Sequence, residues 1–522
     1  MQSDIQQFYK DKTVFVTGGT GFLGKVIIEK LLRSTDVKRI YFLVRKKKDE
    51  NVESRFEVWK NERVFDVLLK AKPEALNLMT PISGDCSAPD LGLSEEDRKI
   101  LTSEVEVVIH SAASIRFVEP LHNALNINTR GTRLMIQLAK EMKGLKAFVH
   151  VSTAYSNCIT NHIQERFYPE NLTCPAAKVL EFNETLSPEL LNSMAPALIG
   201  KFPNTYVYTK ALAEQLIQME GQDLPICIFR PAIIMANFKE PMSGWIDNPH
   251  GVVALIYGSA HGILRLVYTK PNAHAMAVPG DYCANVAVAS GWQVSKNANP
   301  SSFLAAKSLP PIYAFAPDKS NTIDYRTAVQ KSLDNNHKSP VTKTIWYPFA
   351  HFTTCPFLFK LGCIFYHLIP GFFTDLVLRL QGRKPILMKI YPKIHEALIL
   401  LYPFSGRTIV MDTNNTTNIW NDMSAEDRAI FPFDMANLNW DDYFSRIYNG
   451  MREFLFKESW DTLEKAKRRL FWLHLLHRLL EILLYIAVGT LIWTLFLHNN
   501  QEIKTEEVSF PPAIIILPSL VS

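Results

Sequence analysis

Strand-like apolar runs alternate with helix-like patterns through the first half of the chain. After the strand that opens at Thr13, such runs lie at 37–44, 79–85, 105–110, 147–155 and 226–231. Runs of this kind are typical of parallel strands buried on both faces, and the segments between them have the periodicity of helices. The alternation predicts an α/β fold built on a Rossmann-like doubly wound parallel sheet.

The pattern changes in the second half. Residues 301–343 are rich in proline and asparagine, and we interpret them as a boundary after a first domain at 1–300. Residues 344–460 carry helical patterns with acidic residues at helix starts, which predicts a helical C-terminal domain. Within it, 356–370 is apolar but short and bounded by prolines. That favours a half-buried or interfacial helical hairpin over a membrane span.

The last apolar stretch, 479–497, has one early acidic residue, Glu481, and is then uninterrupted. As a helix it would extend about 28 Å, close to the thickness of a hydrocarbon layer. A buried core helix is the alternative, but a helix apolar on all sides would have to lie at the centre of a large domain. We therefore predict an amphipathic segment and membrane anchor at 470–497, followed by a tail at 498–522.

The charges on either side of this stretch predict its orientation. Basic residues precede it and acidic residues follow it: Lys465, Lys467, Arg468 and Arg469 on one side, Glu502, Glu506 and Glu507 on the other. Basic flanks remain in the cytosol. The N-terminal residues lack the apolar run of a signal peptide. We expect the folded body on the cytosolic side of an intracellular membrane.

The composition argues against several other classes of protein. The 522 residues are 47% hydrophobic and 20% charged, with a formal charge of +5. Disorder is therefore not expected, and the sequence does not interleave basic runs with aromatic residues as nucleic-acid binding requires. Seven scattered cysteines without a Cys-x-x-Cys pair favour a reducing compartment, and we expect no metal site.

A glycine-rich turn follows the first strand. Three glycines at this spacing are typical of dinucleotide binding, because they allow a tight turn, leave room for a diphosphate and let the next helix pack closely. Backbone N–H groups at the helix start would then face a phosphate. An ordinary strand-to-helix turn is the alternative. The predicted cofactor contacts here are Gly18, Thr20, Gly21, Phe22, Leu23 and Gly24.

Basic residues end the second strand, where an NAD site would place an acidic residue. Arg45 and Lys46 at this position favour a 2′-phosphate and hence NADPH, although a solvated strand end would look the same. Asp85, after the third strand, is a candidate for the adenine edge. Ala112 is small enough to let the backbone lie against a dinucleotide.

Residues with hydroxyl, phenol and amine groups follow in the chain and are candidates for catalysis. Ser152 and Thr153 lie toward the carboxyl end of the strand at 147–155, where open α/β sheets bind ligands. Tyr206 and Lys210 are four residues apart, so on a helix they share a face. Decoration of a helix surface is the alternative. His110 ends another apolar strand, and we interpret it as a hydrogen-bonded packing residue.

Taken together, these motifs resemble those of a known enzyme family. The glycine turn, the Ser-Thr strand end and Tyr-x-x-x-Lys resemble an extended short-chain dehydrogenase/reductase over the first half of the chain. Longer strings resemble alcohol-forming fatty acyl-CoA reductases: 150–155, 204–214, 230–233 and 244–248. The resemblance implies an NADP-binding reductase domain with substrate loops at 1–300 and contacts of Arg230 and Trp245 with substrate. It also implies a male-sterility-type domain at 344–460 that closes over the reductase.

The resemblance implies NADPH-dependent reduction of a long-chain or very-long-chain fatty acyl-CoA, through thiohemiacetal and aldehyde, to a fatty alcohol. Tyr206 is the expected general acid, and Lys210 is expected to lower its pKa and hold the ribose hydroxyls. Thr153 would donate to the carbonyl oxygen, with Ser152 as second choice.

The main alternative is a membrane-bound hydroxysteroid or sugar-nucleotide dehydrogenase or epimerase of the same fold. A catalytically idle cofactor-binding scaffold is the other. The loop Gly-Trp-Ile-Asp-Asn at 244–248 and the second domain favour an acyl-CoA reductase over both alternatives. Long acyl chains partition into bilayers, so we expect a lipid membrane as partner, that of the endoplasmic reticulum or the peroxisome.

Overall fold

A computed structural model describes residues 3–46, 51–249, 251–297 and 309–506, the last of these without side chains beyond 495. A seven-stranded parallel sheet forms its centre, in the order β11-β7-β5-β4-β1-β2-β3. The strands are β1 (Thr13–Thr17), β2 (Arg39–Val44), β3 (Met79–Ser83), β4 (Val107–His110), β5 (Ala147–Val151), β7 (Ile226–Pro231) and β11 (Ile312–Phe315). The order is that of a doubly wound sheet, which confirms the predicted fold class.

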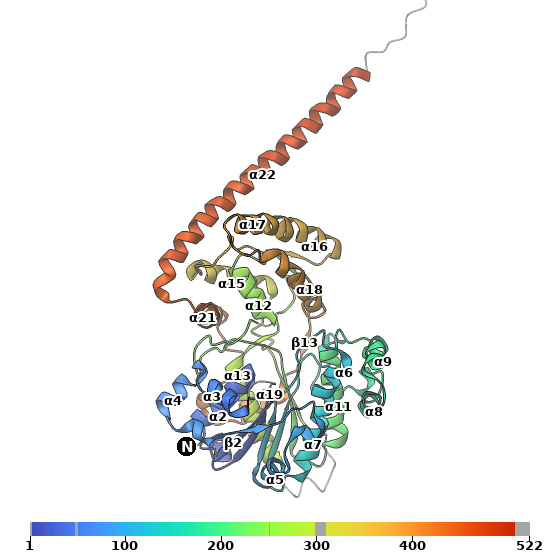
Figure 1. The fold of residues 1–522 in the computed structure, drawn as a ribbon, viewed down its shortest axis with the longest axis vertical. Helices are drawn as coiled ribbons and strands as arrows, with labels where there is room; N and C mark the ends of the chain where they lie inside the picture. Colours follow the sequence, from blue (N-terminus) through green and yellow to red (C-terminus); the bar gives the residue numbers. More distant parts are fainter. Residues whose placement is uncertain (1–2, 47–50, 250, 298–308, 507–522) are drawn as a thin grey trace, which may run out of the picture.

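Helices cover both faces of the sheet (Figure 1). α2 (Phe22–Ser34) and α13 (Gly280–Asn297) pack together on one face, and α7 (Gly131–Glu141) and α11 (Thr205–Glu220) pack together on the other. Since both faces are covered, the inner strands are buried along their whole length. The order of strands in the sheet changes direction at β1 and β4: β2 and β3 follow on one side of β1, and β4, β5, β7 and β11 follow on the other. A crevice for a dinucleotide is expected at this point.

Part of the stretch predicted as a boundary, 301–343, is folded into the body. β11 lies inside it and pairs in parallel with β7, so this stretch supplies the last strand of the main sheet. α15 (Tyr325–Lys338) follows and packs against α12 (Gly251–Ala260) and α21 (Trp440–Gly450). Prolines and asparagines mark the turns around these elements and not a linker between two domains.

The helical segment at 344–460 is not a separate body either. Two of its helices pack on the reductase half: α19 (Asn414–Asp422) on β11, and α20 (Ala425–Ile430) on α1 (Asp4–Tyr9). It also contributes short parallel strands to two pairs, β12 (His351–Thr353) with β9 (Leu266–Tyr268) and β13 (Val410–Met411) with β6 (His162–Ile163). The two halves therefore share one interleaved structure.

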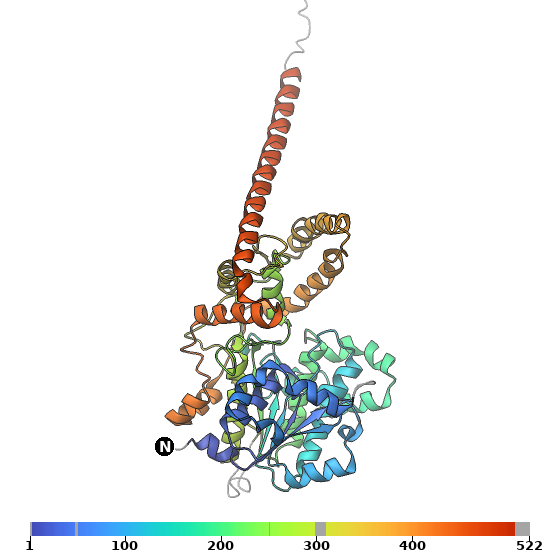
Figure 2. The ribbon, with the colours of Figure 1, turned by 60° about the vertical axis from the view of Figure 1, so that its left-hand side comes forward.

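Two helical stretches are long and apolar enough to cross a membrane by length and composition, at Pro356–Leu380 and Trp460–Leu495. The first consists of α16 (Pro356–Gly362), the π-helical turn η6 (Cys363–Leu368) and α17 (Ile369–Leu380), and it packs on α18 (Leu387–Ser405). The second belongs to α22 (Leu463–Glu506), which extends away from the body in both views (Figure 2).

Candidate active site

The glycine turn between β1 and α2 is shaped by close backbone contacts. Gly18 has a positive φ of 74°, and a Cβ there would lie 2.8 Å from the backbone nitrogen of Ala112, at the end of β4. A Cβ on Gly24 would lie 2.2 Å from the carbonyl oxygen of Gly18. Only glycine fits at either position. The turn lies directly against Ala112, the small residue after β4 that was predicted to lie against the cofactor.

The start of α2 fits a diphosphate. Gly21 is the N-cap of this helix, and within the described residues no side chain caps its first turn. The first N–H groups of a helix have no partner within it, and the positive end of its dipole attracts an anion. Thr20 precedes this cap, and Phe22 and Leu23 begin the helix. The six residues of this turn that were predicted to contact the cofactor therefore lie together at the start of α2.

A cationic side chain projects at the end of β2. The Nε atom of Arg45 lies 2.9 Å from Oδ2 of Asp85, so the structure brings together two residues that the sequence placed separately in the cofactor site. The Arg45 side chain is still 60% exposed, and Lys46 beside it is exposed. Asp85 neutralises part of this charge. Among the described residues Lys46 and the rest of the Arg45 guanidinium have no other ion pair, which fits a site for a phosphate.

Thr153 and Tyr206 meet beyond the carboxyl end of β5. Asn204 caps α11 through the backbone N–H of Val207, which sets the helix start and places Tyr206 in its first turn. The Thr153 hydroxyl neighbours the Tyr206 phenol. Burial raises the pKa of Tyr206 to about 12, and the interaction with Thr153 opposes the rise. The phenol is therefore protonated at neutral pH.

Lys210 follows one helical turn later and is buried. Its Nζ donates a hydrogen bond to the carbonyl oxygen of Val151 at 2.7 Å. Burial lowers the pKa of Lys210 to about 8, against the opposing effect of Glu214. The amine is therefore close to its titration point near neutral pH, where neighbouring charges control how much of it is protonated.

Ser152 and Arg230 belong to a different arrangement. Ser152 Oγ donates to Glu214 at 2.6 Å, and Arg230 makes two bonds to the same carboxylate, at 2.9 and 2.7 Å. The Arg230 guanidinium also donates to two backbone carbonyls, and its side chain is fully buried. Four of the five guanidinium N–H groups of Arg230 are bonded within the protein, so we expect a structural role for Arg230 and not the predicted contact with substrate. Ser152 is likewise oriented away from Thr153.

Trp245 lies at the cofactor end of the site. Its ring stacks on Phe22, the first residue of α2, with centroids 5.2 Å apart and planes 9° apart, and it is buried. Two residues along the same loop, Asp247 pairs with Lys25 of α2 at 2.9 Å. The 244–248 loop is thus attached to the glycine-turn helix.

Two aromatic residues near Tyr206 were missed in the sequence. Phe117 stacks on Tyr206, with centroids 6.0 Å apart, and Phe404 lies 5.4 Å from Phe117. Phe404 also meets Tyr155 edge to face at 5.1 Å. Because Phe404 ends α18, the helical segment supplies part of the wall beside the phenol. No local spacing in the sequence connects residues so far apart, and only the tertiary packing does.

His110 is a packing residue, as predicted. Its Nδ1 lies 2.7 Å from Thr17 Oγ1 and its Nε2 lies 3.2 Å from Thr132 Oγ1. Full burial lowers the pKa of His110 to about 3. The ring is therefore neutral, and both of its nitrogens are used within the core.

A cluster of Cys363, His367 and His395 has ligand atoms within 4.8 Å of one another. His367 Nε2 accepts the backbone N–H of Arg265 at 3.1 Å, so in the neutral ring the hydrogen lies on Nδ1. That N–H donates to His395 Nε2 at 2.9 Å. The lone pairs that a metal would need are occupied, and the cluster is a hydrogen-bonded pair joining η6 to α18.

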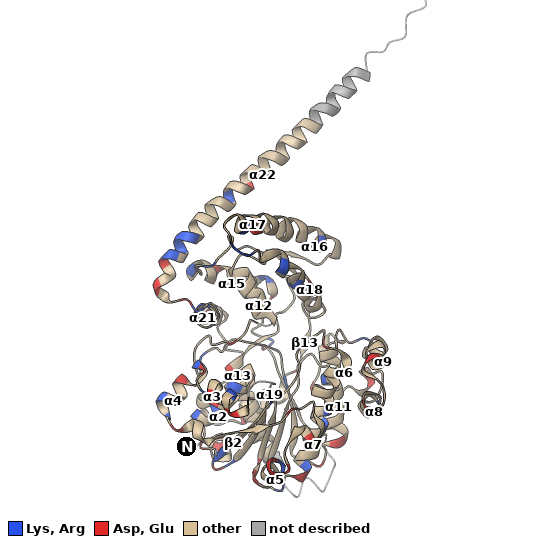
Figure 3. Ribbon diagram, viewed as in Figure 1, with Lys and Arg blue, Asp and Glu red and all other residues tan. Residues whose placement is uncertain are grey.

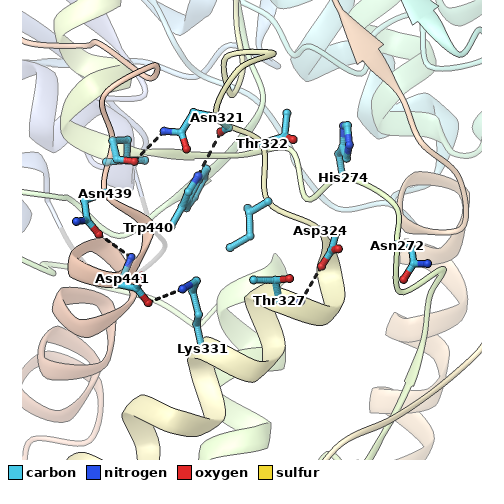
Figure 4. A pocket seen from close by; sticks show the side chains of 12 residues that line it. Asn272, His274, Asn321, Thr322, Asp324, Thr327, Lys331, Asn439, Trp440 and Asp441 are labelled. Atoms are coloured by element: carbon cyan, nitrogen blue, oxygen red, sulfur yellow. Dashed lines mark hydrogen bonds and ion pairs between the residues drawn. The ribbon is translucent and has the colours of Figure 1, made fainter.

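A polar cavity of about 470 Å³ lies between α15 and α21 (Figure 4). Trp440 donates to the carbonyl of Asn321 there, and Lys331 pairs with Asp441 across the opening. The residues that line it include none of the cofactor or catalytic candidates. It is a seam between two helices and not the reaction site.

Comparisons with known proteins place this site in a family. Residues 16–287 match an NAD-binding family model described as "Male sterility protein", and residues 366–458 match a second model with the same description. The chain is 39% identical over 478 residues to "Fatty acyl-CoA reductase wat" of Drosophila melanogaster, covering 91% of this chain and 90% of that protein. It is 34% identical over 498 residues to "Fatty acyl-CoA reductase 1" of Homo sapiens, covering 95% and 94%.

Solved structures share the fold. The reductase (R) domain of a nonribosomal peptide synthetase from Mycobacterium tuberculosis has a TM-score of 0.57 and 19% identity, covering 87% of this chain and 96% of that one. The terminal R domain from the myxalamid PKS-NRPS pathway has a TM-score of 0.55 and 18% identity, covering 86% and 92%. The matched NAD-binding model agrees with a nicotinamide cofactor at the glycine turn.

Proposed function

Because the chain belongs to the fatty acyl-CoA reductase family, we propose that it reduces a long-chain or very-long-chain fatty acyl-CoA to a fatty alcohol with NADPH. The observation that carries the proposal is that the Thr153 hydroxyl lies beside the Tyr206 phenol, with buried Lys210 one turn along the same helix. A hydroxyl, a protonated phenol and an amine are what a carbonyl reduction requires of the protein.

NADPH, when bound, supplies the hydride for the carbonyl carbon. The Thr153 hydroxyl donates to the carbonyl oxygen and holds it beside Tyr206. As negative charge develops on that oxygen, Tyr206 transfers its phenolic proton to it, and protonated Lys210 stabilises the resulting phenolate. The thiohemiacetal then releases CoA as its thiol, and the same groups serve a second reduction, of the aldehyde, to the alcohol.

The experiment is direct. Purified full-length protein is incubated with NADPH and palmitoyl-CoA, the loss of NADPH absorbance is followed, and the extracted lipid is examined for hexadecanol and hexadecanal. We expect two NADPH consumed for each alcohol formed. Oxidation of NADPH with sterol ketones or nucleotide sugars, and none with acyl-CoA of any length, would overturn the proposal in favour of another dehydrogenase of the same fold.

The preference for NADPH over NADH rests on Arg45 and Lys46. We expect Arg45→Gln with Lys46→Gln to weaken NADPH binding at least tenfold while NADH binding changes little, because only NADPH carries the 2′-phosphate. Arg39→Gln is the matched control, since Arg39 is an exposed arginine at the opposite end of the same strand. Equal losses for both cofactors would show that the charges act through stability alone.

Attachment to an intracellular membrane, that of the endoplasmic reticulum or the peroxisome, is part of the proposal. It is supported by the apolar side chains of α22, which from 482 to 495 are exposed on all sides. The basic residues before this run support a catalytic body on the cytosolic side. We expect the full chain to resist extraction by alkaline carbonate and its body to be digested by protease added outside sealed organelles. Release by carbonate would contradict the anchor.

A further inference from the structure

The helical stretch Pro356–Leu380 has its polarity inverted relative to a soluble surface helix. The residues it buries against the body recur at every fourth position: Phe359, Cys363, His367, Gly371 and Asp375. The outward face is mainly apolar and includes Phe357, Phe365, Phe372, Phe373, Val377 and Leu380, each more than half exposed. Lys360 and Arg379 are the charged residues exposed along it. A helix in water places its charged and polar residues outward. This one turns histidine and aspartate inward.

The inward polar groups are fully engaged with the body. Asp375 accepts the backbone N–H groups of Ile386, Leu387 and Met388 at 2.9 to 3.0 Å, which caps the start of α18. His367 accepts the backbone N–H of Arg265. These bonds hold the stretch flat along the body by its polar stripe. A membrane-spanning helix would have to break them and carry Asp375 into the hydrocarbon layer, where a carboxylate is costly.

Basic residues lie next to the apolar face. Arg379 lies near the end of the stretch, and Arg383, Lys384, Lys389 and Lys393 follow it; all five are exposed. Figure 3 shows basic residues in blue on α18. Both ribbon views place α16 and α17 on the side of the body from which α22 extends. An apolar face beside a cationic one, next to a helix with a bare apolar run, matches a bilayer with anionic headgroups.

We propose that Pro356–Leu380 lies in the plane of the bilayer as a second contact of the enzyme with the membrane, its aromatic face among the acyl chains and the basic residues at anionic headgroups. This proposal rests on the anchor assigned to α22. The anchor alone would leave the body free to tilt, whereas a second contact fixes which side faces the lipid.

The consequence concerns the substrate route. α18 packs against α17 near its start and ends at Phe404 beside Phe117 and Tyr206. One helix therefore connects the proposed lipid contact to the catalytic phenol. An acyl chain that leaves the bilayer along this face would meet the aromatic wall of the site without crossing bulk water.

The test uses the full chain in vesicles of phosphatidylcholine with 30% phosphatidylserine, a composition that supplies anionic headgroups. An environment-sensitive fluorophore is attached to Phe373→Cys or Phe365→Cys, in a background carrying Cys355→Ser and Cys174→Ser to remove the accessible thiols. Met219→Cys is the matched control, because Met219 is an equally exposed apolar residue on α11 of the reductase half. Leu491→Cys reports on the anchor.

We expect spin-labelled lipid to quench the labels at 365 and 373 at least twofold and the label at 219 not at all, while aqueous iodide shows the reverse. If iodide quenches 373 as strongly as 219 while 491 is quenched by lipid, the in-plane contact is wrong and the anchor stands. If 373 is shielded from both quenchers, a protein partner covers the face and the proposal is also wrong. Failure of lipid quenching at 491 would contradict the anchor itself.

The charge is tested separately with Arg383→Gln plus Lys384→Gln. We expect quenching of the 373 label to fall in the anionic vesicles to its value in phosphatidylcholine alone. Lys143→Gln plus Lys146→Gln, which removes two exposed lysines just before β5, should leave it unchanged. Equal quenching in both vesicle types for the unmodified basic cluster would overturn its proposed role at headgroups.

Discussion

The Thr153 hydroxyl lies beside the phenol of Tyr206, so the end of β5 meets the first turn of α11. Lys210 adds a second link between the same elements, since its Nζ bonds to the carbonyl of Val151, the last residue of β5. The three proposed catalytic groups are thus held by one strand end and one capped helix. Such a rigid base positions a phenol and a hydroxyl for the same carbonyl oxygen.

Tyr206→Phe is expected to lower kcat for acyl-CoA reduction by about 10² or more while leaving the NADPH dissociation constant within about twofold, because it removes only the proton that the oxygen receives. Tyr208→Phe is the matched control, as Tyr208 is a buried tyrosine on the same helix with a different surrounding. Steady-state kinetics and NADPH fluorescence titration measure the two quantities. A Tyr206→Phe enzyme with full turnover would exclude the phenol as acid.

The pKa of about 8 at Lys210 predicts an alkaline fall in activity. In the proposed mechanism the charged amine stabilises the Tyr206 phenolate, so this help is present below that value and lost above it. We expect kcat/KM to decline as pH rises through about 8. The residual activity of Lys210→Arg should lack this decline, since a guanidinium keeps its charge. A wild-type profile flat to pH 9.5 would contradict the assignment.

The same group makes a prediction for stability. Its pKa in the folded protein is lower than the value near 10.4 of an unfolded lysine. Between about pH 8 and 10.4 the unfolded chain binds the proton that the folded chain has lost, so the free energy of unfolding rises with pH over this window. Comparison of urea unfolding for wild type and Lys210→Met isolates this contribution. An unchanged difference between pH 7.5 and 10 would argue against a depressed pKa.

The parts of the site that could be predicted are those with short, local spacing. The glycine turn and the two residues one helical turn apart on α11 depend on neighbours within a few positions, so their geometry follows from the element that carries them. Arg45 was likewise recognisable as the end of a strand. Its ion pair with Asp85 was not, because it depends on the pairing of β2 with β3.

The parts that could not be predicted depend on contacts between distant segments. β11 lies within a stretch whose composition is that of a boundary, and only its pairing with β7 identifies it. Phe404 is one of many aromatic residues in its region until α18 places it beside Phe117. The family resemblance implied a substrate contact for Arg230, whereas the structure pairs it with Glu214, 16 residues earlier on α11.

The buried pair of Arg230 and Glu214 is expected to be structural. Arg230→Met leaves a buried carboxylate without its partner and should lower the free energy of unfolding by about 3 to 5 kcal/mol. Arg98→Met is the matched control, because Arg98 forms its pair with Glu141 on the surface and should cost no more than about 1 kcal/mol. Urea unfolding measures both. Near-normal stability with a raised KM for acyl-CoA would restore Arg230 as a substrate contact.

Phe404 is expected to matter for the acyl substrate and not for the cofactor. Phe404→Ala opens the aromatic wall beside Tyr206, so kcat/KM for palmitoyl-CoA should fall at least tenfold with the NADPH dissociation constant unchanged. Truncating a buried phenylalanine also costs about 3 to 5 kcal/mol of stability, which must be separated from catalysis. Phe359→Ala provides this control, because Phe359 is equally buried but packs on Tyr268, away from the phenol. If the two variants lose stability and activity in parallel, Phe404 acts only through folding. A selective loss in Phe404→Ala, measured at a temperature where both are folded, would place α18 in the substrate site.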